Sequence, residues 1–108
     1  MTNEKIFKLI EKLHENTEKR KMNWETTASS NKFATSTAEY SIIISEEGGD
    51  YYLTIVDEWD ELIERINDVE LLEVSENSEQ VMKSLFSIAR RNARGADKAI
   101  DDILSSLD

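Results

Sequence analysis

The sequence contains no cysteine and no proline, and it has only three glycines and one histidine in 108 residues. The absence of cysteine excludes a disulfide framework, a thiolate zinc site and a cysteine nucleophile. Proline and glycine mark many of the breaks between structural elements, and both are scarce here. We therefore predict a single domain over residues 1–108, without an interdomain linker.

Long apolar runs are also missing. No run approaches the ~18 residues that a membrane-spanning helix needs, and the first residues lack the apolar segment of a signal peptide. We therefore expect a cytoplasmic protein without membrane contact. His14, the single histidine, has no second histidine, cysteine or adjacent aspartate beside it. We expect a structural or surface role for it, and predict no metal, no cofactor and no catalytic site.

The charge is abundant and unevenly placed. The net charge is −10, and residues 33–82 contain fourteen acids against one base, Arg65. This composition disfavours general nucleic-acid binding, because affinity for phosphate backbones comes mostly from lysine and arginine. Two interpretations of the acidic middle remain. It is either a solvated face that keeps the chain soluble or a surface that captures a basic partner.

Residues 40–56 read as the centre of the fold. The runs Tyr40-Ser-Ile-Ile-Ile-Ser45 and Tyr51-Tyr-Leu-Thr-Ile-Val56 flank a Gly-Gly pair, which predicts a β-hairpin. Neither face of this hairpin is purely polar. The second face is therefore either partly covered or a contact surface.

The flanking segments predict helices and further strands. Apolar spacing predicts an amphipathic helix over residues 4–19, and weak alternation predicts strands over 22–28 and 33–38, with Trp24 and Phe33 as core anchors. A second helix is expected over 78–94, begun by a capping box at Asn77 and ended by Gly95. A final helix, capped by Asp97, should pack against it as a tight hairpin. Its inward residues are spaced at i, i+3, i+4 and i+7, and they are Ile100, Ile103, Leu104 and Leu107.

The second helix also carries a basic stripe on its expected outer face, formed by Lys83, Arg90, Arg91 and Arg94. Arginines near a helix C-terminus complement the helix dipole and would pair with Asp97, Asp101 or Asp102. The alternative is a site for phosphate or an acidic partner.

Residues 60–66 are ambiguous from periodicity. Trp59, Leu62, Ile63 and Ile66 fit helical spacing, whereas residues 62–66 also fit a strand that pairs back on the hairpin. In the strand interpretation, Trp59 sits at a turn among four acids. It then either folds onto the sheet or stands exposed as an anchor of the kind that dominates protein interfaces.

The segment Leu85-Phe-Ser-Ile-Ala-Arg-Arg-Asn-Ala-Arg-Gly-Ala-Asp-Lys-Ala-Ile-Asp-Asp-Ile-Leu104, together with the order of elements, resembles a group of small uncharacterised proteins from bacteria, archaea and mobile elements. The resemblance covers most of the chain and implies a strand at 60–66. It implies no activity, so no functional residue follows from it. The chain departs from the group's pattern at Glu58-Trp59-Asp60, where the group has Asp/Asn-Gly.

These observations predict an α+β fold. It comprises an N-terminal helix, an antiparallel meander of four to five strands, and two C-terminal helices packed on one sheet face. For function, we expect a small acidic interaction protein that binds and blocks another protein with a basic surface, as phage inhibitors, immunity proteins and antitoxins do. The expected binding edge comprises Glu46, Glu47, Asp50, Asp57, Glu58, Trp59, Asp60, Glu61 and Glu64.

Three alternatives stay open. A DNA mimic would arrange its carboxylates like phosphates and compete with DNA for its partner. A metal-dependent enzyme would use carboxylates such as Asp57 and Glu61, although the sequence offers no supporting constellation. A structural homodimer would associate through the outer sheet face at Ile43, Tyr52 and Val56.

Overall fold

The fold is α+β, as the sequence predicts, in a computed structural model that describes residues 2–108. Helix α1 (Thr2–Glu18) precedes five strands in one antiparallel sheet, and the sheet is followed by a short 3-10 turn and two helices. The strands are β1 (Glu25–Thr26), β2 (Lys32–Ser36), β3 (Tyr40–Glu47), β4 (Asp50–Asp57) and β5 (Leu62–Asn67), and the sheet keeps this order from edge to edge. The helices that follow are η1 (Glu70–Glu73), α2 (Ser78–Arg94) and α3 (Ala96–Leu107).

The central hairpin forms where it was predicted. Strands β3 and β4 pair over their whole length, from Tyr40 opposite Asp57 to Glu47 opposite Asp50. The connecting Gly48 and Gly49 have φ values of +62° and +93°, which residues with a Cβ rarely adopt. The glycine pair therefore fixes the turn and with it the register of β3 against β4.

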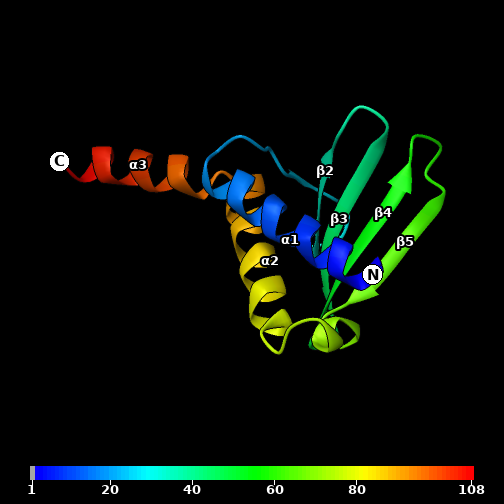
Figure 1. Cartoon of the computed structure of the whole chain (residues 1–108). Helices are drawn as coiled ribbons and strands as arrows, with labels where there is room; N and C mark the ends of the chain where they lie inside the picture. The colour runs from blue at the N-terminus through cyan, green and yellow to red at the C-terminus, as the bar shows by residue number, and fades with distance from the viewer. Residues whose placement is uncertain (1) are drawn as a thin grey trace.

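Helices α1 and α2 cover one face of the sheet (Figure 1). The predicted anchors Trp24 and Phe33 are buried, at 3% and 1% exposure. Phe33 packs edge-on against Phe86 of α2, with ring centroids 5.6 Å apart. Residues at helical spacing on α1 and α2 complete this core, namely Ile6, Ile10, Leu13, Met82, Leu85 and Ala89. The opposite sheet face carries Tyr52, whose ring lies under Arg65 at 4.4 Å.

The ambiguous segment is a strand. Strand β5 pairs antiparallel with β4, and the register shifts between Ile55 and Val56, so Ile63 is the extra residue of a bulge. This confirms the strand interpretation over the helix. Burial of Ile66 against Leu53 outweighs the helical spacing, because a strand here extends an existing sheet.

Several local predictions are wrong. Only Glu25–Thr26 of the strand expected over 22–28 pairs with the sheet. The capping box at Asn77 does not form, because Asn77 makes no side-chain cap bond. Asp97 was expected to be the N-cap of α3, but Gly95, with a left-handed φ of +65°, takes the N-cap position. Asp97 therefore lies in the first turn of the helix. The end of α2 at Gly95 is confirmed.

Helix α3 does not form the predicted tight hairpin with α2. It extends away from the rest of the molecule (Figure 1), and among the described helices and strands it contacts α2 alone. No residue of α3 is buried. Helical periodicity correctly identified an apolar face on this segment, but the left-handed Gly95 turns the chain outward, so nothing within the described chain covers that face.

Candidate interaction surface

The turn between β4 and β5 is organised by the side chain of Asp57. Its Oδ1 accepts the backbone N–H groups of Trp59 at 2.9 Å and of Glu61 at 3.0 Å. A backbone hydrogen bond also spans the turn, since the N–H of Asp60 donates to the carbonyl of Asp57 at 3.0 Å. Asp60 has a φ of +62°, a conformation that aspartate tolerates better than most residues. These bonds hold the turn in one shape.

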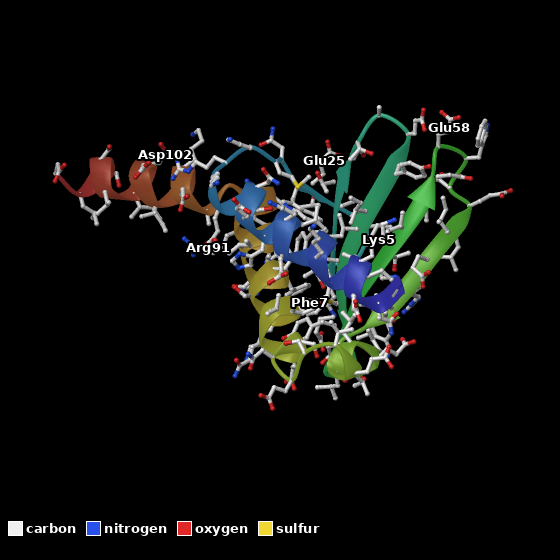
Figure 2. The ribbon with its side chains drawn as sticks, in the orientation of Figure 1. Lys5, Phe7, Glu25, Glu58, Arg91 and Asp102 are labelled. Atoms are coloured by element: carbon white, nitrogen blue, oxygen red, sulfur yellow. The ribbon has the colours of Figure 1, made fainter. Side chains whose placement is uncertain are left out.

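This shape leaves the indole of Trp59 in solvent. Trp59 is 75% exposed, so it stands out from the sheet and does not fold onto it. Two more large apolar residues at this end of the sheet are exposed. Leu62, at the start of β5, is 64% exposed, and Tyr40, which pairs with Asp57 across the sheet, is 44% exposed. Figure 2 places Glu58 at this turn, at the end of the sheet away from α3. We call this group the tip surface, and its members are Tyr40, Glu58, Trp59, Asp60, Glu61 and Leu62.

The carboxylates of the tip surface lack neutralising partners. Within residues 2–108, Glu58, Asp60 and Glu61 form no ion pair with lysine, arginine or histidine. All three are exposed. The tip surface therefore combines uncompensated negative charge with an exposed aromatic side chain.

The other predicted acids lie elsewhere. Glu46, Glu47 and Asp50 flank the opposite end of the β3–β4 hairpin. Strand β4 has eight residues, so the two ends are separated by roughly 23 Å at about 3.3 Å per residue. Glu64 lies on β5 between the two groups, paired with Ile55. The nine residues expected to form one acidic edge therefore do not lie together: three lie at the β3–β4 turn, five lie at the β4–β5 turn, and Glu64 lies between them. Of these residues, only Trp59 at the β4–β5 turn is an exposed aromatic.

The acids at the far end also have internal partners. Glu47 pairs with Arg65 at 3.0 Å and accepts a bond from Ser45, while Glu46 accepts the backbone N–H of Gly49 at 2.8 Å. Burial by itself would raise the pKa of Glu47, but the Ser45 hydroxyl and the Arg65 guanidinium bind its charged form and hold the pKa below the ordinary value. These carboxylates therefore stabilise the hairpin.

A hydrogen-bonded chain that the sequence did not predict joins α1 to α2. His14 Nδ1 lies 3.1 Å from Glu18 Oε1, and His14 Nε2 lies 2.7 Å from Ser84 Oγ. The order of groups matches a nucleophile, a base and an orienting acid. His14 and Glu18 are one helical turn apart and could have been noticed as a pair, but Ser84 is 70 residues away and only the fold brings it to His14.

The geometry around Ser84 does not support acyl transfer. Ser84 lies in the middle of α2, where the backbone N–H groups bond within the helix and cannot form an oxyanion hole. The adjoining recess, of about 350 Å³, is lined by Glu11, His14, Gln80, Val81 and Ser84. The chain of bonds therefore serves to fix α1 on α2.

Two of the four residues in the basic stripe on α2, Arg91 and Arg94, contact other parts of the chain. Arg91 pairs with Asp97 at 3.3 Å, as predicted, and Arg20 joins the same carboxylate at 3.1 Å. Arg94 donates to the carbonyl of Ser30 and lies over the Phe33 ring. Figure 2 shows Arg91 at the base of α3, where a recess of about 380 Å³ opens beside these groups. Asp97 already occupies the place that an anion would take between the two arginines.

Two further features bear on the class of protein. No helix in the described part of the chain combines the length and apolar content of a membrane span. Residues 2–108 contain no cluster of three or more histidine, aspartate or glutamate side chains suited to a metal ion.

The geometry thus defines an α+β meander domain whose β4–β5 turn exposes an aromatic side chain among acids. Comparisons of the chain with protein-family models, with curated proteins and with solved structures found no match.

Proposed function

We propose that this chain is a small protein-interaction module that binds another protein through the tip surface and blocks or modulates that protein. The observation that carries the proposal is the 75% exposure of Trp59 among carboxylates without ion-pair partners. Exposing a tryptophan to water forgoes burial of one of the largest apolar side chains. Because Asp57 holds the turn rigid, little conformational entropy is lost when a partner covers it.

The partner that fits this surface has an apolar pocket rimmed by lysine or arginine. Burial of the indole would supply most of the affinity, since tryptophan is among the residues most enriched at interface hot spots. The carboxylates would raise the association rate at low salt, where screening is weak. This division of roles predicts that substitutions of Trp59 and of the acids change different kinetic constants.

The test uses the tagged protein in an extract of the organism that makes it, with bound proteins eluted in salt steps and identified by mass spectrometry. Binding of the recovered partner is then measured for the wild type and two tip variants. Trp59→Ala should weaken affinity by about 30-fold, corresponding to about 2 kcal/mol at a hot spot. Glu58→Lys/Glu61→Lys should mainly slow association and remove its salt dependence.

Matched controls place the same changes away from the tip. Leu72→Ala truncates another exposed apolar residue, at 50% exposure, and Glu11→Lys/Glu76→Lys makes an equal charge change at two exposed acids. Both controls should bind like the wild type. A partner that binds Trp59→Ala and Glu58→Lys/Glu61→Lys as tightly as the wild type would remove the tip surface from the proposal. Release of the partner by added DNA would narrow the function to DNA mimicry.

A further inference from the structure

Strand β5 forms one margin of the sheet (Figure 1). Among the described helices and strands it contacts β4 and η1 alone, so its outer edge has no strand or helix beside it. The opposite margin is closed. There β1 pairs with β2, the Thr27 hydroxyl donates to the carbonyl of Lys32 at 2.9 Å, and the backbone N–H of Trp24 donates to Asn92 Oδ1 at 2.6 Å. The two margins of the sheet are therefore treated differently.

The ladder between β4 and β5 shows which backbone groups face the open edge. The N–H of Asp68 donates to the carbonyl of Tyr51 at 3.1 Å, and the two residues continue the register of β4 with β5. Hydrogen-bonded pairs alternate with non-bonded pairs along an antiparallel ladder. Ile66 and Glu64 therefore bond β4 through their backbones. Arg65 lies between them, so its N–H and C=O point away from β4.

The next outward-facing group confirms this direction. The N–H of Asn67 bonds Glu70 Oε1 at 3.2 Å and not β4. Glu70 thus closes the edge at its end. Arg65 bonds Glu47 through its guanidinium, and within residues 2–108 no side chain bonds its backbone as Glu70 bonds Asn67. The N–H and C=O of Arg65 are an open donor and acceptor of the kind that an added strand pairs with.

We propose that the partner bound at the tip surface adds an extended, basic segment of its own to β5, as a sixth strand. This inference rests on the proposed function and names how the partner would bind. Leu62 lies three residues before Arg65 on the same strand, roughly 10 Å away at about 3.3 Å per residue. A short segment that exchanges backbone bonds with Arg65 therefore also reaches the tip surface.

The charge around β5 selects a basic segment. Residues 57–73 contain eight acids and one base, Arg65, and the Arg65 guanidinium already pairs with Glu47 at 3.0 Å. A segment with lysine or arginine would meet complementary charge, whereas an acidic segment would be repelled. The same charge disfavours a second copy of β5 as the occupant, because two acidic edges would then lie side by side.

The bulge at Ile63 keeps the added ladder short. It bends the strand and interrupts regular pairing between Leu62 and Arg65. Such a short ladder fixes register and orientation more than it supplies affinity. An isolated peptide should therefore bind weakly, with a dissociation constant on the order of 0.1–1 mM. In the whole partner, burial of Trp59 would add to this affinity.

Amide hydrogen exchange followed by NMR tests the pairing. The probe is a synthetic peptide of alternating lysine and valine, about eight residues long, within the usual length of a strand. With peptide at about ten times its dissociation constant, exchange of the Arg65 N–H should slow about tenfold. The N–H groups of Glu64 and Ile66 already bond β4 and should change much less. A glutamate–valine peptide, and the lysine peptide methylated on its backbone nitrogens, should leave Arg65 exchange unchanged.

Three results would overturn the proposal. The first is fast Arg65 exchange with lysine peptide at about 10 mM, ten times the weakest expected dissociation constant. The second is equal protection by either control peptide, since binding would then need no backbone pairing or no positive charge. The third is protection of Arg65 that appears without peptide and grows with protein concentration, because a second copy would then occupy the edge.

Two variants test the same N–H in binding to the recovered partner. Arg65→Pro removes this N–H, and proline is tolerated on an edge strand where the N–H faces outward. Arg65→Ala loses the same side chain and ion pair but keeps the N–H. Arg65→Pro should bind at least about fivefold more weakly than Arg65→Ala, as expected for one lost hydrogen bond. Far-ultraviolet circular dichroism checks the fold of both variants, and the wild-type exchange measurement decides if Arg65→Pro does not fold.

The two proposals fail in different ways. A partner that binds Trp59→Ala weakly but binds both Arg65 variants alike would keep the proposed function and overturn the edge pairing. A partner that binds Trp59→Ala as tightly as the wild type, while the lysine peptide still protects the Arg65 N–H, would remove the tip surface and leave the edge of β5 as the docking site.

Discussion

A single hydroxyl joins α1 to the first core anchor. The indole Nε1–H of Trp24 donates to Thr17 Oγ1 at 2.9 Å, and the same hydroxyl donates to the carbonyl of Leu13 at 2.7 Å. Thr17 is 5% exposed and Trp24 is 3% exposed, so water does not replace this acceptor. Thr17→Val keeps the shape of the side chain and removes only the hydroxyl.

The expected cost follows from the unpaired donor. In Thr17→Val the Leu13 carbonyl loses the bond from the Thr17 hydroxyl but still accepts a backbone bond within α1. The indole N–H of Trp24, in contrast, loses its acceptor. A buried donor without a partner costs about 1–3 kcal/mol. In a domain of 108 residues, each kcal/mol lowers the melting temperature by about 4–5 °C. Thr17→Val should therefore melt about 4–15 °C below the wild type.

The control is Thr17→Ser, which keeps the hydroxyl and removes one methyl group, at about 0.8 kcal/mol. Thermal and urea unfolding of the three proteins, followed by circular dichroism at 222 nm, gives the comparison. The reasoning requires Thr17→Val to be the less stable variant. If Thr17→Val matches or exceeds Thr17→Ser in stability, the indole N–H has another acceptor and the hydroxyl is not the link between α1 and Trp24.

Two further predictions concern other groups. Arg65→Gln should raise the pKa of Glu47 towards its ordinary value of 4.5. A carboxyl whose pKa is lower in the folded protein than in the unfolded chain stabilises the fold at any pH above its unfolded pKa, and this stabilisation is lost as the pH falls through the folded pKa. The difference in melting temperature between wild type and variant should therefore be largest at neutral pH. The gap should close below about pH 4.5, and a gap that persists under acid would contradict the ion pair's role. Ser84 should not react with a fluorophosphonate probe, because α2 provides no oxyanion donors around it. Labelling that disappears in Ser84→Ala would show that the His14 hydrogen bond activates this serine.

The sequence predicted correctly those features that depend on residues close together along the chain. The Gly48-Gly49 turn, the end of α2 at Gly95 and the anchors Trp24 and Phe33 follow from turn chemistry and burial preference. The strand at β5 needed more than periodicity, because its apolar residues fit helix and strand alike. Pairing with β4 decides the matter, and this pairing depends on the fold.

The candidate site was less predictable, for physical reasons. Glu47 and Glu58 are both acids of the same sequence segment, but the length of β4 carries them to opposite ends of the sheet. Arg65 is 18 residues from Glu47, and only the sheet brings the two together. For α3, periodicity identified the apolar face but could not say what covers it, since a stripe has the same pattern whether it faces a core or a second molecule.

The outward direction of α3 has a consequence for local stability. Helix α3 buries none of its residues, and among the described helices and strands it contacts α2 alone. Opening of this helix therefore breaks few contacts with the rest of the molecule. Residues 96–107 can unfold and refold as a unit of their own while the sheet and the helices that cover it stay folded.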